Sequence, residues 1–197
     1  MMRRALQAIV RRIGLVFDYL LVRTGPRQKV HGLWLACAVV DSDCAEFFGR
    51  CREALELIRT YDPRRFNRIA AQVKTIATTT RGASYYEPPL RTLFLDVDVL
   101  KLEPPYIAAN IVHEATHARI YHAGVRNYAT NPERHERLCV SAEVEFATKL
   151  PNSERLTQEL AKQLERPWWN QEGRRNQIKR FIRRNKMPAW LARFLLR

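Results

Sequence analysis

Apolar residues recur along much of this chain at the spacing of an α-helix, roughly 3.6 residues per turn. Residues 5–22 place their large apolar side chains on one face, and an acidic cluster ending at Asp43 is a capping signal for a second helix, to about residue 60. The other helical patterns are a short helix after Asp62-Pro63, longer ones over residues 105–122 and 132–149, and a helical part over residues 153–197 with breaks at Pro167 and Pro188. The pattern therefore predicts a mostly helical protein.

A different pattern follows the third of these helices. Residues 72–79 form a short run rich in β-branched side chains, and residues 92–100 alternate between apolar and polar side chains, as half-buried strands do. Pro88 and Pro89 exclude one continuous strand between the two segments. We expect two or three short antiparallel strands here. The predicted class is α+β, mostly α, with a small antiparallel sheet before the helix over residues 105–122.

The four cysteines contain no Cys-x-x-Cys pair. Cys37, Cys44 and Cys51 recur every seven residues, which on a helix makes one buried stripe, and free cysteines are commonly buried apolar residues. Cys139 stands apart from them. We therefore expect free thiols rather than a disulfide framework, and with them a reducing, cytoplasmic location.

The charge of the chain is concentrated at its two ends. The net charge is +14; residues 1–30 carry seven basic side chains and one acidic one, and residues 166–197 carry ten basic side chains and one acidic one. We predict three parts: a basic amphipathic N-terminal helix (1–30), a central domain (31–165) and a basic amphipathic C-terminal tail (166–197). The basic ends favour an anionic partner, first a membrane surface and second a nucleic acid. No apolar run is long enough to span a bilayer, so membrane association would be peripheral.

Residues 113–117 read His-Glu-Ala-Thr-His inside the predicted helix over residues 105–122. Residues i and i+4 lie on one helix face, so the imidazoles of His113 and His117 can reach one tetrahedral Zn²⁺. Glu114 projects beside them, where it can accept a proton from water at the metal without being a ligand itself. The motif predicts a zinc hydrolase.

A catalytic zinc also needs a third protein ligand and an open position for water. The next predicted helix offers Glu136 and, seven residues further on, Glu143. Two helical turns separate these glutamates by about 10 Å along the axis, so only one of them can bind the same ion. Glu136 is the favoured ligand, Glu143 is the alternative, and His135 ranks below both.

The motif, followed after 18 residues by Glu136, resembles the HExxH-x18-E pattern of the gluzincin metallopeptidases. The resemblance covers residues 72–147 and implies a minimal zincin-like fold in which Glu136, on the helix after the motif, is the third zinc ligand. Thermolysin-like members have a tyrosine eleven residues after the second histidine, here Tyr128, which helps to stabilise the oxyanion. The chain departs from the pattern in two places: it lacks a GxMEN-type motif, and Val140 stands where thermolysin-like members have an acid that orients a histidine.

These residues together predict hydrolysis of peptide bonds. Zinc would polarise the substrate carbonyl, and Glu114 would take a proton from the attacking water and deliver it to the leaving amine. Tyr128, or in second place His122 or His135, would stabilise the oxyanion. Residues 92–95 are expected to supply a sheet edge to which an extended peptide adds, which makes a peptide or protein the expected substrate.

Two other functions are consistent with the same residues. The chain could be a membrane- or nucleic-acid-associated zinc-binding protein without peptidase activity, in which no coordination position stays open. It could also be a zinc hydrolase that acts on a non-peptide amide or ester, because the motif specifies the attacking water and not the acyl group.

Overall fold

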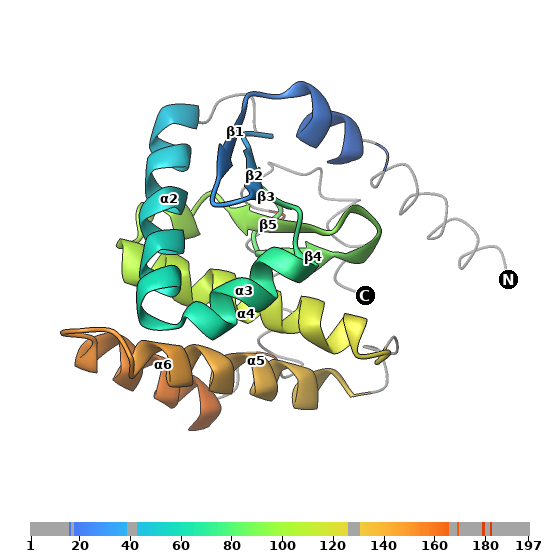
Figure 1. Ribbon diagram of the computed structural model, residues 1–197. Helices are drawn as coiled ribbons and strands as arrows, with labels where there is room; N and C mark the ends of the chain where they lie inside the picture. Colours follow the sequence, from blue (N-terminus) through green and yellow to red (C-terminus); the bar gives the residue numbers. More distant parts are fainter. Residues whose placement is uncertain are drawn as a thin grey trace, which may run out of the picture.

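The structure, a computed structural model, describes residues 16, 18–38, 43–125, 131–165, 169, 179 and 182. Its helices are α2 (Cys44–Tyr61), α3 (Pro63–Gln72), α4 (Pro104–His122), α5 (Pro132–Ala147) and α6 (Glu154–Glu165), and residues 18–24 are also helical. Its strands are β1 (Arg27–Val30), β2 (Leu33–Ala36), β3 (Thr75–Thr79), β4 (Tyr85–Glu87) and β5 (Thr92–Asp96), with 3-10 turns at Pro88–Leu90 and Val99–Lys101. The predicted class, α+β and mostly α, is confirmed (Figure 1).

The five strands form one sheet in the order β1-β2-β3-β5-β4. β3 pairs in parallel with both β2 and β5, while β1 and β4 pair antiparallel at the two edges. The sheet is therefore mixed rather than purely antiparallel, because α2 and α3 form the crossover that returns the chain from β2 to β3 in the same direction. β5 lies between β3 and β4, so the expectation that residues 92–95 supply a free sheet edge was wrong.

β1 and β2 form a hairpin that the hydrophobic pattern did not predict. Val30 pairs with Leu33, and the two residues between them, His31 and Gly32, both have positive φ, 48° and 89°. Two consecutive residues with positive φ are typical of the type I′ turn, whose twist suits a two-residue hairpin. The sheet thus begins inside residues 1–30, the segment that the charge distribution assigned to an N-terminal helix.

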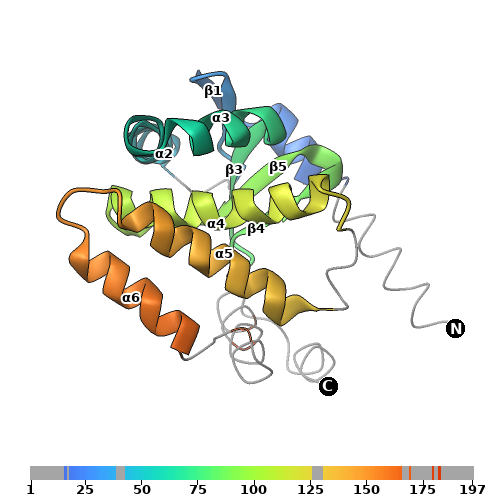
Figure 2. The ribbon, with the colours of Figure 1, turned by 60° about the horizontal axis from the view of Figure 1, so that its bottom comes forward.

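α4 is the central helix of the structure. Alternate residues of β2, β3 and β5 point to one face of the sheet and pack with α2 and α4 in the main apolar cluster. The opposite face carries a smaller cluster around Phe94, against which Leu21 and Val22 of the helical segment pack. Figure 2 shows α5 lying along α4, on the side away from the sheet. The middle part of α4 is therefore enclosed between the sheet and α5.

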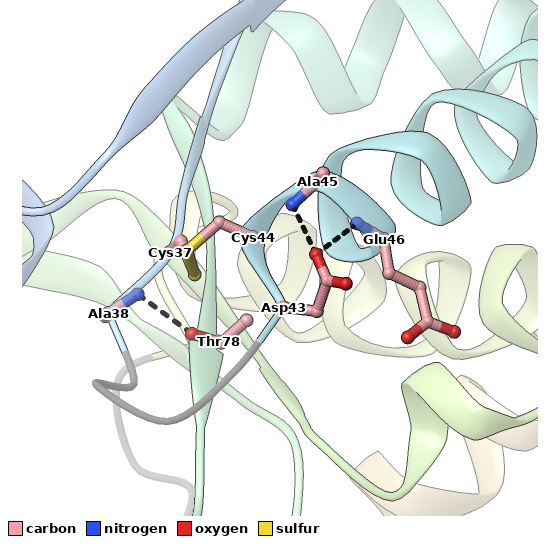
Figure 3. Close-up of a disulfide and its surroundings, with 7 residues drawn as sticks. All are labelled: Cys37, Ala38, Asp43, Cys44, Ala45, Glu46 and Thr78. Atoms are coloured by element: carbon pink, nitrogen blue, oxygen red, sulfur yellow. Dashed lines mark hydrogen bonds between the residues drawn. A yellow bond between two sulfur atoms is a disulfide. The ribbon is translucent and has the colours of Figure 1, made fainter.

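A disulfide joins Cys37, just after β2, to Cys44, the first residue of α2 (Figure 3). The prediction that all four cysteines are free was wrong for this pair. Because α2 begins only at Cys44, the seven-residue spacing from Cys37 is not a helical repeat. Cys51 and Cys139 are free and buried, as predicted. Disulfides persist mainly in oxidising compartments, so the predicted cytoplasmic location loses the argument on which it rested.

Polar contacts fix the start of α2 next to the disulfide. The carboxylate of Asp43 accepts hydrogen bonds from the backbone N–H groups of Ala45 and Glu46, at 2.9 and 3.0 Å (Figure 3). The N–H of Ala38 donates to Oγ1 of Thr78 on β3 at 2.8 Å. The predicted capping role of Asp43 is therefore confirmed, and the cap and the disulfide together tie α2 to the end of β2.

The predicted terminal segments lie largely outside the described residues. Of residues 166–197, the structure describes only residues 169, 179 and 182, so the predicted amphipathic tail is not tested. Near the other end, Arg81 forms an ion pair with the buried Asp18 at 2.7 Å and so joins the helical segment over residues 18–24 to the sheet. None of the described helices is both long and apolar enough to cross a membrane.

A buried ion-pair network joins α3 to α5. Asp62 accepts hydrogen bonds from the side chains of Arg65 and Lys149, each at 2.8 Å, and Arg65 also lies 3.1 Å from Glu145. Asp62 also caps α3 through the N–H of Arg65. Burial alone would raise the pKa of Asp62, but the hydrogen bonds from Arg65 and Lys149 outweigh burial and lower that pKa.

We expect Asp62→Asn to lower the free energy of unfolding by about 2–3 kcal/mol at neutral pH, because the buried Arg65 would lose one of its two charge partners and keep only the exposed Glu145. A carboxyl group whose pKa is lowered by folding contributes stability above its unfolded pKa, and this contribution falls as the pH drops through the folded pKa. The deficit of the variant should therefore shrink below about pH 4. Urea denaturation at pH 7 and pH 3 measures it, and an equal deficit at both values would contradict this account. Glu56→Gln, in the exposed Glu56–Arg59 pair, is the control.

Candidate metal centre

α4 carries the His-Glu-Ala-Thr-His motif in its middle. Pro104 and Pro105 occupy its first turn, where a missing N–H leaves no helical hydrogen bond unmade, and Gly124 follows its end with a φ of 87°. The helix therefore begins and ends where the sequence predicted. Residues 111–116 are all buried, so the polar side chains of the motif lie in the interior and need polar partners.

α5 supplies these partners. Asn131 caps the helix by accepting a backbone hydrogen bond, and Pro132 is its first residue. The buried face of α5 carries four side chains that can bind a proton or a metal: His135, Glu136, Cys139 and Glu143. Two helices that follow one another in the sequence thus bring imidazole, carboxylate and thiol groups into one buried cluster.

Glu136 faces both histidines of the motif. Its Oε2 lies 3.3 Å from Nε2 of His113 and 3.8 Å from Nε2 of His117. The two imidazole rings have centroids 5.1 Å apart. Among the described residues, the group whose donor atoms all lie within 4.8 Å of one another is His113, His117 and Cys139, and Glu136 stands just outside it. The three residues expected as zinc ligands are therefore neighbours in the structure.

Glu143 contacts the other ring nitrogen of His113. Its Oε2 lies 3.2 Å from Nδ1, and both side chains are 7 % exposed. A carboxylate on the nitrogen that faces away from a metal fixes the tautomer and orientation of a ligand histidine. Glu143 therefore lies where an orienting carboxylate belongs, behind His113, rather than facing the two Nε2 atoms.

Cys139 is the member of the cluster that the sequence analysis missed. Its Sγ and ring nitrogens of His113 and His117 all lie within 4.8 Å of one another, so these three residues are close enough to bind a metal ion. Cys139 follows Glu136 by three residues, which places both side chains on one face of α5. This spacing was the available signal, but a single cysteine in a helical pattern is ordinarily a small core residue.

Glu114 is buried next to the same groups, with 5 % of its surface exposed. Burial, opposed by His113 and reinforced by Glu136 and Glu143, raises the pKa of Glu114 to about 7. A carboxyl group with a pKa near neutrality can both accept and donate a proton under physiological conditions. This is the property that a general base next to a metal requires.

The pKa values of the two histidines are shifted in opposite directions. Burial lowers the pKa of His113, but the nearby carboxylates, Glu143 foremost, outweigh burial and raise that pKa well above its usual range. Burial, together with His113 and His135, lowers the pKa of His117 to about 3. Three buried carboxyl groups, those of Glu114, Glu136 and Glu143, thus lie around the two imidazoles. A divalent cation bound here would be attracted by whichever of them are ionised.

The cluster is most accessible at His117. The side chain of His117 is 17 % exposed, against 7 % for His113 and 8 % for Glu136. Solvent therefore reaches the cluster from the His117 side. A water molecule or a substrate carbonyl would approach from this side.

The remaining predicted residues divide into three cases. Tyr128 lies outside the described residues. His122 is half a turn away from the face of His113, and its Nε2 lies 3.1 Å from the Tyr86 hydroxyl of β4, so its second-place role in oxyanion stabilisation stays a prediction. His135 is buried on α5, next to Glu136 in the sequence, and its role stays a prediction.

Comparison with known proteins identifies no relative: no family model, no curated protein and no solved structure matches the chain. The resemblance to gluzincins therefore stays a prediction from the sequence motif and Glu136.

Proposed function

We propose that the protein is a zinc-dependent hydrolase of the minimal gluzincin type, a peptidase. One observation carries the proposal: a single carboxylate oxygen of Glu136 faces Nε2 of both His113 and His117, inside a buried cluster of carboxyl and imidazole groups. Glu143 supports the same arrangement from behind His113. The donor set of two imidazoles and one carboxylate is one that Zn²⁺ uses in hydrolases.

His113, His117 and Glu136 would hold the ion, which would supply Lewis acidity toward a substrate carbonyl and a water molecule. Glu114 accepts one proton from the attacking water while the water oxygen forms a bond to the carbonyl carbon. Glu114 then delivers that proton to the amide nitrogen, whose bond to the carbon breaks, so that a carboxylic acid and an amine leave. The acid then gives its proton to the amine or to solvent, which yields a carboxylate. The pKa of Glu114, about 7, suits both transfers.

We also propose where a peptide substrate would bind on the sheet. The two edges of the described sheet are β1 and β4, and β4 contacts α4 through the hydrogen bond between Tyr86 and His122. An extended peptide can add to a free strand edge by main-chain hydrogen bonds. β4 is therefore the strand on which peptide binding near the metal centre would be tested, in place of β5.

The test of this function is metal analysis combined with peptide cleavage. We expect about one zinc per chain, hydrolysis of a mixed peptide library followed by mass spectrometry, loss of hydrolysis after removal of zinc with a chelator, and recovery when zinc is added back. A protein that holds one zinc and leaves every peptide intact would refute the peptidase. If the same sample cleaved non-peptide amides or esters instead, the protein would be a zinc hydrolase with a non-peptide substrate.

A second candidate, a zinc-binding protein without hydrolase activity, is favoured by one observation. Cys139 offers a fourth donor atom near the two histidines. Four protein donors around one zinc ion are typical of structural sites, which leave no open position for water. The membrane or nucleic-acid partner of such a protein remains a proposal that rests on the basic ends of the sequence.

A further inference from the structure

The cluster contains one more donor than a catalytic zinc site uses. The Sγ of Cys139 and ring nitrogens of His113 and His117 lie within 4.8 Å of one another, and Glu136 faces the same two imidazoles at 3.3 and 3.8 Å. In a tetrahedral zinc site with bonds of about 2.0–2.3 Å, ligand atoms stand about 3.3–3.6 Å apart. Side-chain movements of about 1 Å would therefore bring the sulfur atom onto the same ion.

We infer that Cys139 is the fourth protein ligand of the metal ion. Its thiolate takes the coordination position that the attacking water needs and holds the centre closed, and the thiol proton passes to solvent when the ion binds. The inference rests on the proposed metal site and names its regulation: hydrolysis requires Cys139 to leave the ion. A thiolate donor also selects Zn²⁺ or Co²⁺ over Mg²⁺ and Ca²⁺.

The geometry of α5 permits this arrangement without any change of the backbone. Glu136 and Cys139 lie three residues apart on the buried face, so both side chains approach α4 from the same helical turn. Cys139 is fully buried, beside the ion pairs that His113 and His117 form with carboxylates of α5. The two helices therefore present nitrogen, oxygen and sulfur donors to one point.

The states of the other cysteines identify which sulfur atom would give a metal–thiolate signal. Cys37 and Cys44 are joined in a disulfide, and Cys51 lies on α2 in the main apolar cluster. A thiolate signal from the bound metal would therefore belong to Cys139. Cys51→Ala is the matched control, because it also removes a buried free thiol.

The test uses the full chain loaded with Co²⁺ in place of zinc. We expect an intense near-ultraviolet absorption from sulfur-to-cobalt charge transfer in the wild type and in Cys51→Ala, and its loss in Cys139→Ala. The Cys139→Ala variant should still bind one Co²⁺ through the two histidines and Glu136. Stoichiometric Co²⁺ without this absorption in the wild type, or its persistence in Cys139→Ala, would overturn the inference. The wild-type spectrum alone decides if the variant does not fold.

Peptide hydrolysis by the zinc forms separates the failure of this inference from the failure of the proposed function. Higher hydrolysis by Cys139→Ala than by the wild type supports both. The charge-transfer absorption without hydrolysis by either protein supports the Cys139 ligand and refutes the peptidase. Hydrolysis by the wild type without the absorption refutes the Cys139 ligand and leaves the peptidase standing.

Discussion

Replacing Glu114 by glutamine is expected to slow peptide hydrolysis by about 10²–10⁴-fold while the bound zinc stays in place. Glutamine keeps the shape of the side chain but cannot take a proton from water. The uncharged side chain should fit, because the pKa of Glu114 is already raised to about 7 and its neutral form is populated near neutral pH. Steady-state kinetics and metal analysis of the same preparation measure the two effects separately.

Glu103→Gln is the matched control for this experiment. Glu103 precedes the same helix, is exposed, and makes no capping hydrogen bond with its side chain. Its replacement should change neither the zinc content nor the rate. A Glu114→Gln protein that retains zinc and hydrolyses peptides at the wild-type rate would remove Glu114 from the mechanism, whatever the identity of the ligands.

Glu136→Ala and Glu143→Ala are expected to weaken zinc binding to different degrees. Glu136 faces Nε2 of both histidines and would lose a direct bond to the ion, so we expect its removal to lower the affinity by more than about 100-fold. Glu143 contacts only Nδ1 of His113, and loss of such an orienting carboxylate typically costs about 10–100-fold. Competition with a chromophoric chelator measures both affinities.

The order of the two effects is the informative result. If Glu143→Ala lowered the affinity far more than Glu136→Ala, the assignment of ligand and orienting residue would have to be exchanged. Glu133→Ala, an exposed glutamate in the first turn of α5, controls for the general effect of removing an acidic side chain from this helix. It should bind zinc as the wild type does.

The helices of this protein could be predicted from its sequence because their signals are local. Asp43, Asn131 and the prolines at the first turns of α3, α4 and α5 mark helix starts that the structure confirms. The parallel pairing of β3 with β2 and β5 could not be predicted, because it depends on a crossover and not on the pattern within each strand. The β1–β2 hairpin was missed for another reason: its turn is His31-Gly32 rather than the more typical Asn-Gly or Asp-Gly.

The candidate site could be predicted only in part. The spacing of His113 and His117 follows from helix geometry, and Glu136 from its position on the next helix. The choice between Glu136 and Glu143 required the relative rotation of α4 and α5, which determines the ring nitrogen that each carboxylate meets. Cys139 was missed because burial alone does not distinguish a ligand thiol from a core residue.

Every donor of the cluster lies between His113 and Glu143, on two helices that are consecutive in the chain and otherwise held together by packing. A bound ion would therefore act as a cross-link between α4 and α5. Because it would bind the native chain and not the unfolded one, the melting temperature would rise with the free ion concentration. α4 also supports the sheet, so depletion of the ion would loosen the interior rather than a peripheral loop. The donor residues of the cluster would then determine both the metal binding of the protein and how long its fold persists when the metal is scarce.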